Sequence, residues 1–333
     1  MSVTSFVHGD ENDMNASLCP SDPALTLKQG QTRDFDEQAT LLRGWNQHYA
    51  QLSPGRFRGA IVELLFDDIH LFMESTSHAL HQHGKLDEEA IAIGVPLRAN
   101  GHGLFCGSIM ATGAAPVFSG RDGFEFYSPD QLTMGGMVAS RQALAEWLPE
   151  QELDELEGSA HLKKASPQTL AEAGRFLQTI FDLCRHSPNL QQSAAFRQRM
   201  RDSVYACMAD VLTDCNDQER NLSPGRRARV VQQARDYIEA AGDEPVGVED
   251  LCRELNVSRR TLQYCFQEVL GMNPVAFVRA RRLNRVRQLL KEVDSVTEAA
   301  TAWGFWHFGH FSQEYKKLFG ELPSDTMRRH NRP

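Results

Sequence analysis

The chain has 333 residues, of which 41% are hydrophobic and 24% charged, and its formal net charge is −9. This length can bury two cores, so we expect two domains. The longest apolar runs fall short of the roughly 18–20 residues that a membrane span needs, and the acidic N-terminal residues do not resemble a secretion signal. Seven cysteines without a CxxC pair argue against a disulfide framework or a structural zinc site and favour a cytoplasmic protein.

The sequence predicts an N-terminal tail, a first domain, a linker and a second domain. Residues 1–32 are predicted to be a disordered tail, and residues 33–52 a helix that ends at Ser53-Pro54-Gly55. Short apolar segments separated by Gly, Pro and Asp between residues 57 and 140 predict a β domain, a barrel or a sandwich. Two amphipathic helices are expected at about 167–184 and 190–215, and either could form a dimer interface or pack on the core. The polar segment 216–224 is predicted to be a linker, which gives a first domain at 33–215 and a second at 225–333.

The C-terminal domain is predicted to be entirely helical, and its charge differs from the rest of the chain. Residues 1–225 hold 17 Lys and Arg against 30 Asp and Glu, whereas residues 226–333 hold 18 against 14. An acidic body with a locally basic module is typical of DNA-binding regulators. A basic helix face exposed to solvent is the alternative explanation. The helices are expected at about 224–242, 248–255, 258–270, 274–292, 296–303, 307–319 and 323–330.

This C-terminal third contains an internal repeat. The segment VEDLCRELNVSRRTLQYCFQEVLGMNP at 248–274 resembles VTEAATAWGFWHFGHFSQEYKKLFGELP at 296–323. Each copy has a short helix, a tight turn and a longer helix, which is the pattern of a helix-turn-helix motif. Gly271 and Gly320 are predicted to end the longer helices in the left-handed conformation, and Ser258 and Ser295 to cap helix starts. The repeat therefore predicts helix-turn-helix units at 248–270 and 296–319.

The segment that joins the two units, Pro274 to Glu292, is predicted to be one helix of about 28 Å at about 1.5 Å per residue. One turn of B-DNA is about 34 Å long, so this spacer could place two recognition helices in successive major grooves. A helical bundle without a DNA role, or a repeat used for protein contacts, is the alternative. Arg281, Arg282 and Arg285 on this helix either contact phosphates or face solvent.

Three segments, NVSRRTLQYCF, RARRLNRVRQLL and WGFWHFGHFSQEYKKLFGELP, resemble the signature of the AraC/XylS family of bacterial transcription activators over about residues 228–330. The resemblance implies an α+β protein with an N-terminal cupin-like β-barrel for effector sensing and dimerisation. It also implies a C-terminal domain with two helix-turn-helix motifs. Promoter DNA, RNA polymerase and a second copy of the chain would be its partners.

Some segments are also similar to the branch of this family that regulates ethanolamine operons, including WNQHYAQLSPGRFRG at 45–59 and the GFWH form at 304–307. That similarity implies an activator with ethanolamine as effector and adenosylcobalamin as a co-effector. A virulence or quorum-sensing regulator with an unknown effector, or with none, is the first alternative. A cupin-like metal enzyme that carries a DNA-binding tail is the alternative from a different class of protein.

Helical spacing separates core residues from residues that could contact DNA. On the first recognition helix, Arg259, Arg260 and Gln263 are predicted to read bases, because Arg pairs with guanine and Gln with adenine through two hydrogen bonds. Tyr264 and Gln267 are predicted to contact phosphate. The residues predicted to bind DNA are Ser258, Arg259, Arg260, Gln263, Tyr264, Gln267, His307, His310, Ser312, Gln313 and Lys316.

Other chemistry has little support in the sequence. His78, His81 and His83 do not have the spacing of a helical or finger-type metal site, so no metal is predicted. Neither a G-x-S-x-G nor a phosphate-binding glycine motif is present, and no catalytic residue is predicted. A β-barrel could still enclose a small ligand. Trp45, Phe72, Glu74 and Tyr127 are conceivable lining residues, and an acidic residue would suit an amine.

Overall fold

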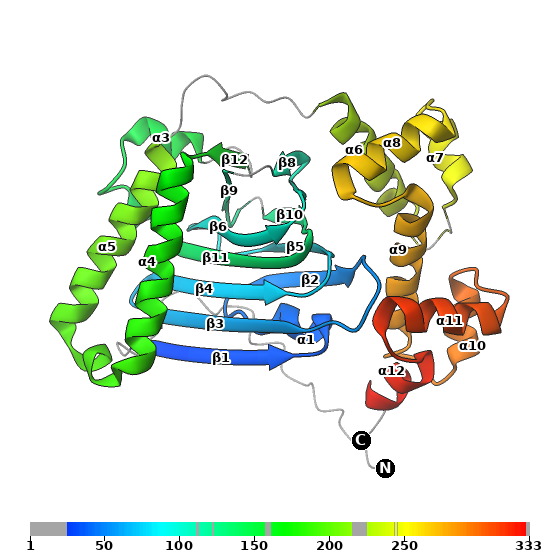
Figure 1. Cartoon of the computed structure of the whole chain (residues 1–333), viewed down its shortest axis with the longest axis horizontal. Coiled ribbons are helices and arrows are strands. Elements are labelled where there is room, and N and C mark those ends of the chain that lie inside the picture. Colours follow the sequence, from blue (N-terminus) through cyan, green and yellow to red (C-terminus); the bar gives the residue numbers. More distant parts are fainter. Residues whose placement is uncertain are drawn as a thin grey trace, which may run out of the picture.

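The computed structural model describes residues 25–110, 113–121, 123–156, 161–214, 225–242, 244 and 246–330. In Figure 1 a pair of long helices (green) lies at the left, the β-strands occupy the middle, and the helices of the C-terminal third (yellow to red) lie at the right. The strands form two sheets. The expected α+β class is confirmed. None of the described helices is both long enough and apolar enough to cross a membrane.

The larger sheet is antiparallel and has seven strands. Its β3–β4 hairpin turns at Asp67, which adopts a left-handed conformation with φ of 47°, a conformation that Asp tolerates better than most residues. In spatial order the strands are β1 (Thr26–Thr32), β3 (Gly59–Phe66), β4 (Ile69–Thr76), β11 (Asp130–Ser140), β6 (Ala90–Asn100), β9 (Ala114–Ser119) and β12 (His161–Lys164).

The smaller sheet faces the larger one and has five strands: β2 (Asn46–Gln51), β5 (Leu80–Lys85), β10 (Phe124–Tyr127), β7 (Gly103–Phe105) and β8 (Ser108–Met110). Side chains such as Phe72, Phe118 and Phe126 fill the space between the sheets. The expected closed barrel is not formed by the described strands, which belong to two separate sheets. The alternation of apolar residues predicts strands, but it does not specify which strands pair.

Two sequence predictions fail at the start of the β domain. Thr26–Thr32 forms β1, so the predicted tail is wrong for these residues, while 1–24 lies outside the described residues. The predicted helix at 33–52 is also wrong, since only Phe35–Thr40 (α1) is helical and Asn46–Gln51 is β2. Pairing of β2 with β5 outweighs the local helical pattern, as tertiary contacts often do.

Two long helices, α4 (Pro167–His186) and α5 (Ala194–Thr213), cover the outer face of the larger sheet. Ser166 caps α4, because its hydroxyl accepts a hydrogen bond from the backbone N–H of Thr169. Both helices pack on the sheet and bury a large apolar cluster. The remaining short helices are α2 (Arg141–Leu144), α3 (Glu150–Glu155) and a 3-10 turn at Pro188–Gln192.

All the regular elements described in the C-terminal third are helices. Its helices are α6 (Arg226–Ala240), α7 (Val248–Glu254), α8 (Arg259–Leu270), α9 (Pro274–Leu289), α10 (Val296–Ala302), α11 (Phe308–Phe319) and α12 (Pro323–His330). Gly271 and Gly320 end α8 and α11 with φ of 67° and 70°, as the repeat predicts. Helix α9 ends at Leu289 rather than Glu292, so it is about 24 Å long. The predicted linker 216–224 lies outside the described residues.

One hydrophobic cluster continues from the helical domain into the β domain. Phe35, Tyr49 and Leu80 belong to the same buried cluster as Phe277 and Phe319. The rings of Phe35 and Phe319 stack with their centroids 5.9 Å apart. An apolar contact of this kind holds two domains in a defined arrangement better than a polar surface does.

Candidate nucleic-acid interface

Helix α8 separates a buried face from an exposed face as its sequence predicts. Leu262, Cys265, Phe266 and Val269 are buried. Arg259, Arg260, Gln263, Tyr264 and Gln267 are all exposed. The Arg260 guanidinium lies 5.6 Å from the centre of the Tyr264 ring. Within the described part of the chain, neither Arg259 nor Arg260 forms an ion pair, so both guanidinium groups are available to DNA.

Ser258 has a local structural role. Its hydroxyl accepts a hydrogen bond of 3.1 Å from the backbone N–H of Thr261 and so caps α8. Its DNA-binding role stays a prediction.

Helix α11 is the equivalent element of the second repeat. His307, His310, Gln313 and Lys316 are exposed, and Ser312 is half-buried. The His310 ring nitrogen lies 3.5 Å from the carboxylate of Glu314. Unlike α8, this helix has no side-chain hydrogen bond at its cap residue, His307.

The sequence prediction omitted two aromatic residues beside this set. Trp306 and Phe308 are 71% and 41% exposed, respectively. Their place, Phe308 between the predicted contact residues His307 and His310 and Trp306 directly before them, is the signal that could have identified them.

The arginines of α9 mostly bind the protein itself. Arg282 donates hydrogen bonds to the backbone carbonyls of Trp303 and Gly304, and Arg281 pairs with Glu239 at 3.2 Å. Arg279 pairs with Glu314 of α11 at 2.8 Å. These contacts fix the turn of the second motif and its helix, so much of the basic charge of α9 is used structurally.

A cleft of about 880 Å³ separates the recognition helices from the β domain. Gln267 of α8 and His310, Gln313 and Lys317 of α11 line one side. The opposite side is formed by loops of the β domain at 52–54, 100–102 and 129–130. The fold thus brings the two predicted recognition surfaces together at their inner edges, which face the β domain. Arg259, Arg260, Gln263 and Tyr264 do not line this cleft.

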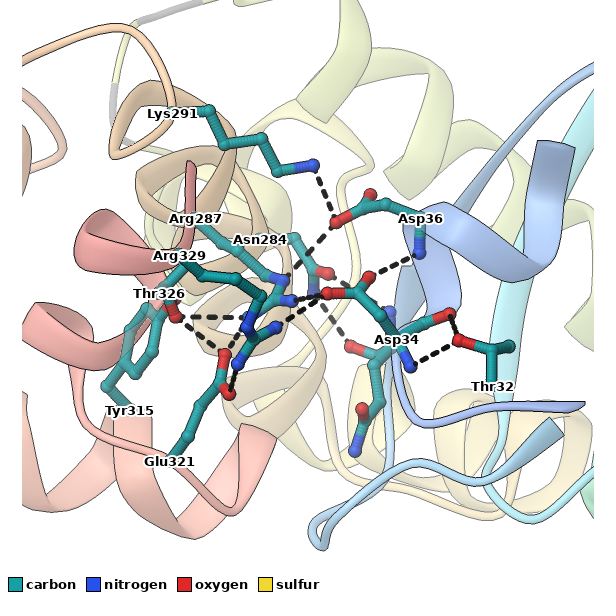
Figure 2. Close-up of polar contacts among 11 residues, drawn as sticks. Thr32, Asp34, Asp36, Asn284, Arg287, Lys291, Tyr315, Glu321, Thr326 and Arg329 are labelled. Carbon is teal, nitrogen blue, oxygen red and sulfur yellow. Dashed lines mark hydrogen bonds and ion pairs between the residues drawn. The ribbon is translucent and has the colours of Figure 1, made fainter. Parts of the chain in front are cut away.

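An ion-pair network joins the two domains (Figure 2). The Arg287 side chain of α9 is only 4% exposed, and it contacts Asp34 at 2.6 Å, Asp36 at 3.3 Å and Glu321 at 2.5 Å. Lys291 pairs with Asp36 at 2.8 Å. Because Asp34 and Asp36 begin α1, the network fastens α1 to the helix that joins the two motifs.

A second polar contact crosses the same boundary. The Asn284 amide donates to the backbone carbonyl of Gln51 at 2.7 Å and accepts from its backbone N–H at 3.0 Å. The edge of β2 is thus paired with a side chain of α9. Such a two-point contact fixes the register of the two domains as well as their proximity.

Burial raises the pKa of Asp34, but the charges of Arg287, Lys291 and Arg329 outweigh it and hold the pKa below its usual range. Burial likewise raises the pKa of Glu321, and hydrogen bonds from Thr326 and Arg287 reverse that shift. Both carboxyl groups are therefore ionised at neutral pH and stabilise the contact between the domains.

A small cavity lies between the two sheets and encloses about 50 Å³. Its walls include Trp45 and Glu74, and Trp45 packs edge-on against Phe72, with ring centroids 5.2 Å apart. These three conceivable lining residues therefore meet in one place. Tyr127 does not, because it stacks on His81 at the domain boundary, with ring centroids 4.3 Å apart.

Glu74 is the charged residue of this cavity. Its carboxylate accepts hydrogen bonds from Tyr49 at 2.9 Å and from Gln38 at 3.0 Å. Burial raises the pKa of Glu74 despite these bonds. Among the described residues, the buried donors Trp45 Nε1 and Gln82 Nε2 have no partner. A buried donor without a partner is costly, so these groups suit a ligand with its own polar atoms.

His81, Glu125 and Glu239 place potential metal-ligand atoms within 4.8 Å of one another. Two guanidinium groups lie among them, however: Arg281 contacts His81 at 2.8 Å, and Arg235 pairs with Glu125. Arg281 also pairs with Glu239. Because both carboxylates already have a guanidinium partner, a metal ion is disfavoured at this cluster. The cluster is better explained as a polar contact between β5, β10 and the helical domain.

Residues 251–329 match the family described as a helix-turn-helix domain. The probable thc operon regulatory protein of Rhodococcus erythropolis is 40% identical over 103 residues, which cover 30% of this chain and 31% of that protein. XylDLEGF operon transcriptional activator 2 of Pseudomonas putida is 37% identical over 106 residues, which cover 31% and 65% of the two proteins. The chain thus spans less than two thirds of each of these relatives.

A solved structure of a regulator with an AraC-type DNA-binding domain from Chromobacterium violaceum is also similar. It is 32% identical and covers 32% of this chain and 95% of its own, with a TM-score of 0.29.

Proposed function

Because the C-terminal domain is a helix-turn-helix domain of the AraC/XylS type, we propose that this protein is a sequence-specific transcription regulator. The observation that carries the proposal is the repeated unit, in which α8 and α11 each expose polar residues beside a buried apolar face. Both named relatives are operon regulators, so we infer activation of an operon. A homodimer on promoter DNA, with RNA polymerase as a further partner, completes the proposal.

The proposed effector is a small amine such as ethanolamine, bound between the sheets. Its ammonium group would pair with Glu74, and the rings of Trp45 and Phe72 would provide cation–π contacts. A hydroxyl group could accept from the unpartnered donors of Trp45 and Gln82. A cavity of about 50 Å³ suits a ligand of a few heavy atoms. Adenosylcobalamin does not fit this cavity, and a co-effector of that size would need a different site.

The proposed coupling between effector and DNA runs through α1. Gln38 of α1 donates to Glu74 in the cavity, and Asp34 and Asp36 at the start of α1 bind Arg287 of α9. A ligand that binds the carboxylate of Glu74 competes with Gln38 for it. This competition shifts the populations of the positions that α1 can adopt. Helix α9 connects both motifs, so a change in its contacts with the β domain would alter the distance between the two motifs.

A genome-wide map of DNA fragments retained by the purified protein, at two salt concentrations and with or without ethanolamine, tests the proposal. Base-specific sites should survive the higher salt better than random DNA, because phosphate contacts weaken steeply with salt. Peaks upstream of amine-breakdown genes that strengthen with ethanolamine are the expected result. Retention no better than that of random DNA under all conditions would contradict a sequence-specific regulator.

A further inference from the structure

The two most exposed large hydrophobic side chains among the described residues are Trp306 at 71% and Tyr264 at 59%. Both belong to the helix-turn-helix repeats. In the second repeat, Phe305 and Phe311 turn inward and pack together with centroids 5.2 Å apart, whereas Trp306 and Phe308 turn outward. Large exposed aromatic groups often mark a surface that a partner covers.

Gly309 lies in the first turn of α11, between Phe308 and His310. Glycine destabilises a helix relative to alanine. Apart from its chain neighbours and the backbone of its own helix, no atom of the described residues lies within 4 Å of the position that a Cβ would occupy, and the φ angle of Gly309 is not positive. Neither packing nor backbone geometry therefore requires glycine. A residue without a side chain at this exposed position lets a partner approach α11 closely.

The character of the exposed residues identifies the partner. His307, His310, Lys316 and Lys317 are exposed on the same motif and give it basic or protonatable groups. The corresponding part of α8 exposes Arg259 and Arg260, which suit guanine, whereas the exposed face of α11 has no arginine. In the major groove, thymine alone presents a methyl group, and Gln pairs with adenine through two hydrogen bonds. An apolar surface with Gln313 on the same helix therefore suits A·T pairs.

Building on the proposed function, we propose that α11 and the turn before it read DNA by apolar contact: Trp306 and Phe308 pack against thymine methyl groups, and Gly309 lets the helix approach the base edges closely. The two motifs then have different specificities. The half-site of α8 contains guanine, and the half-site of α11 consists of A·T pairs whose thymine methyl groups contribute to affinity.

Replacement of thymine by uracil in the bound DNA tests this inference, since uracil lacks only the methyl group. Fluorescence anisotropy of full-length protein on a mapped site should show a roughly fourfold loss of affinity per contacted methyl, the equivalent of about 0.8 kcal/mol for one buried carbon. The loss should be confined to the α11 half-site, should be smaller in Trp306→Ala, and should disappear in the double variant Trp306→Ala/Phe308→Ala. Equal affinity for thymine and uracil DNA would overturn the proposal.

Gly309→Ala separates folding from recognition. Its melting temperature should equal or exceed that of the wild type, because alanine favours the helix, while specific affinity falls at least tenfold. Gly225→Ala is a control in the same domain, since its Cβ would also meet nothing within 4 Å and Gly225 is the cap residue of α6 rather than part of α8 or α11. Unchanged affinity in Gly309→Ala would overturn the inference.

Two further outcomes distinguish this inference from the proposed function. If Arg260→Ala weakens specific binding while Trp306→Ala and Gly309→Ala do not, the result supports the proposed regulator function and contradicts apolar contact between α11 and DNA. If these two variants bind DNA normally but no longer activate transcription, the aromatic surface docks a protein, and the inference is again overturned. Failure of the wild-type protein to select any sequence would instead remove the proposed function itself.

Discussion

At the scale of single residues, exposure and pairing determine which side chains are available to a partner. Arg282 and Arg287 are occupied, by backbone carbonyls and by carboxylates respectively. Arg260 is exposed and lies against the Tyr264 ring. A guanidinium held by an aromatic ring loses less conformational entropy on binding. The basic composition of the C-terminal domain alone could not separate these two groups of arginines.

Arg260→Ala should weaken binding to a specific site by about 1–3 kcal/mol and leave binding to random DNA nearly unchanged, because it removes a base contact. Anisotropy titrations on specific and random DNA at the same salt concentration measure both values. Arg253→Ala is the control, since Arg253 is exposed on α7 and pairs with Asp250. Equal losses on both DNAs would show that Arg260 contacts phosphate.

Glu74→Gln should abolish the response to an amine effector while the protein still folds, because Gln retains the shape of the side chain and lacks its charge. Calorimetric titration of ethanolamine should show heat of binding for the wild type and none for the variant. Glu63→Gln is a comparison variant: Glu63 is also buried, but it pairs with His70 rather than lining the cavity. Undiminished ethanolamine binding by Glu74→Gln would place the amine elsewhere.

At the scale of elements, caps and turns define where the recognition helices begin and end. Ser258 caps α8 through its hydroxyl, whereas α11 begins at His307 without such a bond. Both helices end at a glycine in the left-handed conformation. These features are local in sequence, and for this reason the helix bounds at 259–270 and 308–319 agree closely with the repeat.

Ser258→Ala should lower stability by about 1 kcal/mol through loss of the cap. Ser258→Asp, which restores an acceptor at the same position, should recover most of this loss. Thermal unfolding followed by circular dichroism compares the two variants. If DNA affinity falls in Ser258→Ala by much more than the change in stability explains, Ser258 also contacts DNA, as the sequence predicts.

At the scale of the whole molecule, a continuous apolar cluster and the network around Arg287 hold the β domain against the helical domain. The cleft of about 880 Å³ lies at this boundary and includes the inner edges of both recognition helices. Access of DNA to these edges therefore depends on the arrangement of the two domains. A change in the arrangement of the domains would thus regulate DNA binding without any change in the structure of the recognition helices.

The network should respond to acid. The pKa of Asp34 is lower in the folded protein than in the unfolded chain, so its stabilising contribution is complete above about pH 4 and is lost as the pH falls below that value. Asp34→Asn should therefore lower the stability by roughly 1–3 kcal/mol at pH 7, and this difference should shrink at acid pH. Melting curves at pH 7, 5 and 3.5 follow the difference.

Asp182→Asn serves as the control, because Asp182 forms an exposed pair with Arg185 that contributes little at any pH. A stability difference between Asp34→Asn and the wild type that is independent of pH would show that the charge of Asp34 is not what matters.

The amino-acid sequence by itself determined the features that depend on neighbours along the chain: the helices of the two motifs, their caps, and the exposed faces of α8 and α11. Helical periodicity and turn chemistry act over a few residues, so they can be read directly. Tertiary structure alone decided that 46–51 is a strand, because β2 exists through its pairing with β5. It also brought Asp34 to Arg287 and Glu74 to Tyr49. Such contacts between distant segments depend on how the sheets pair and pack, which no local pattern records.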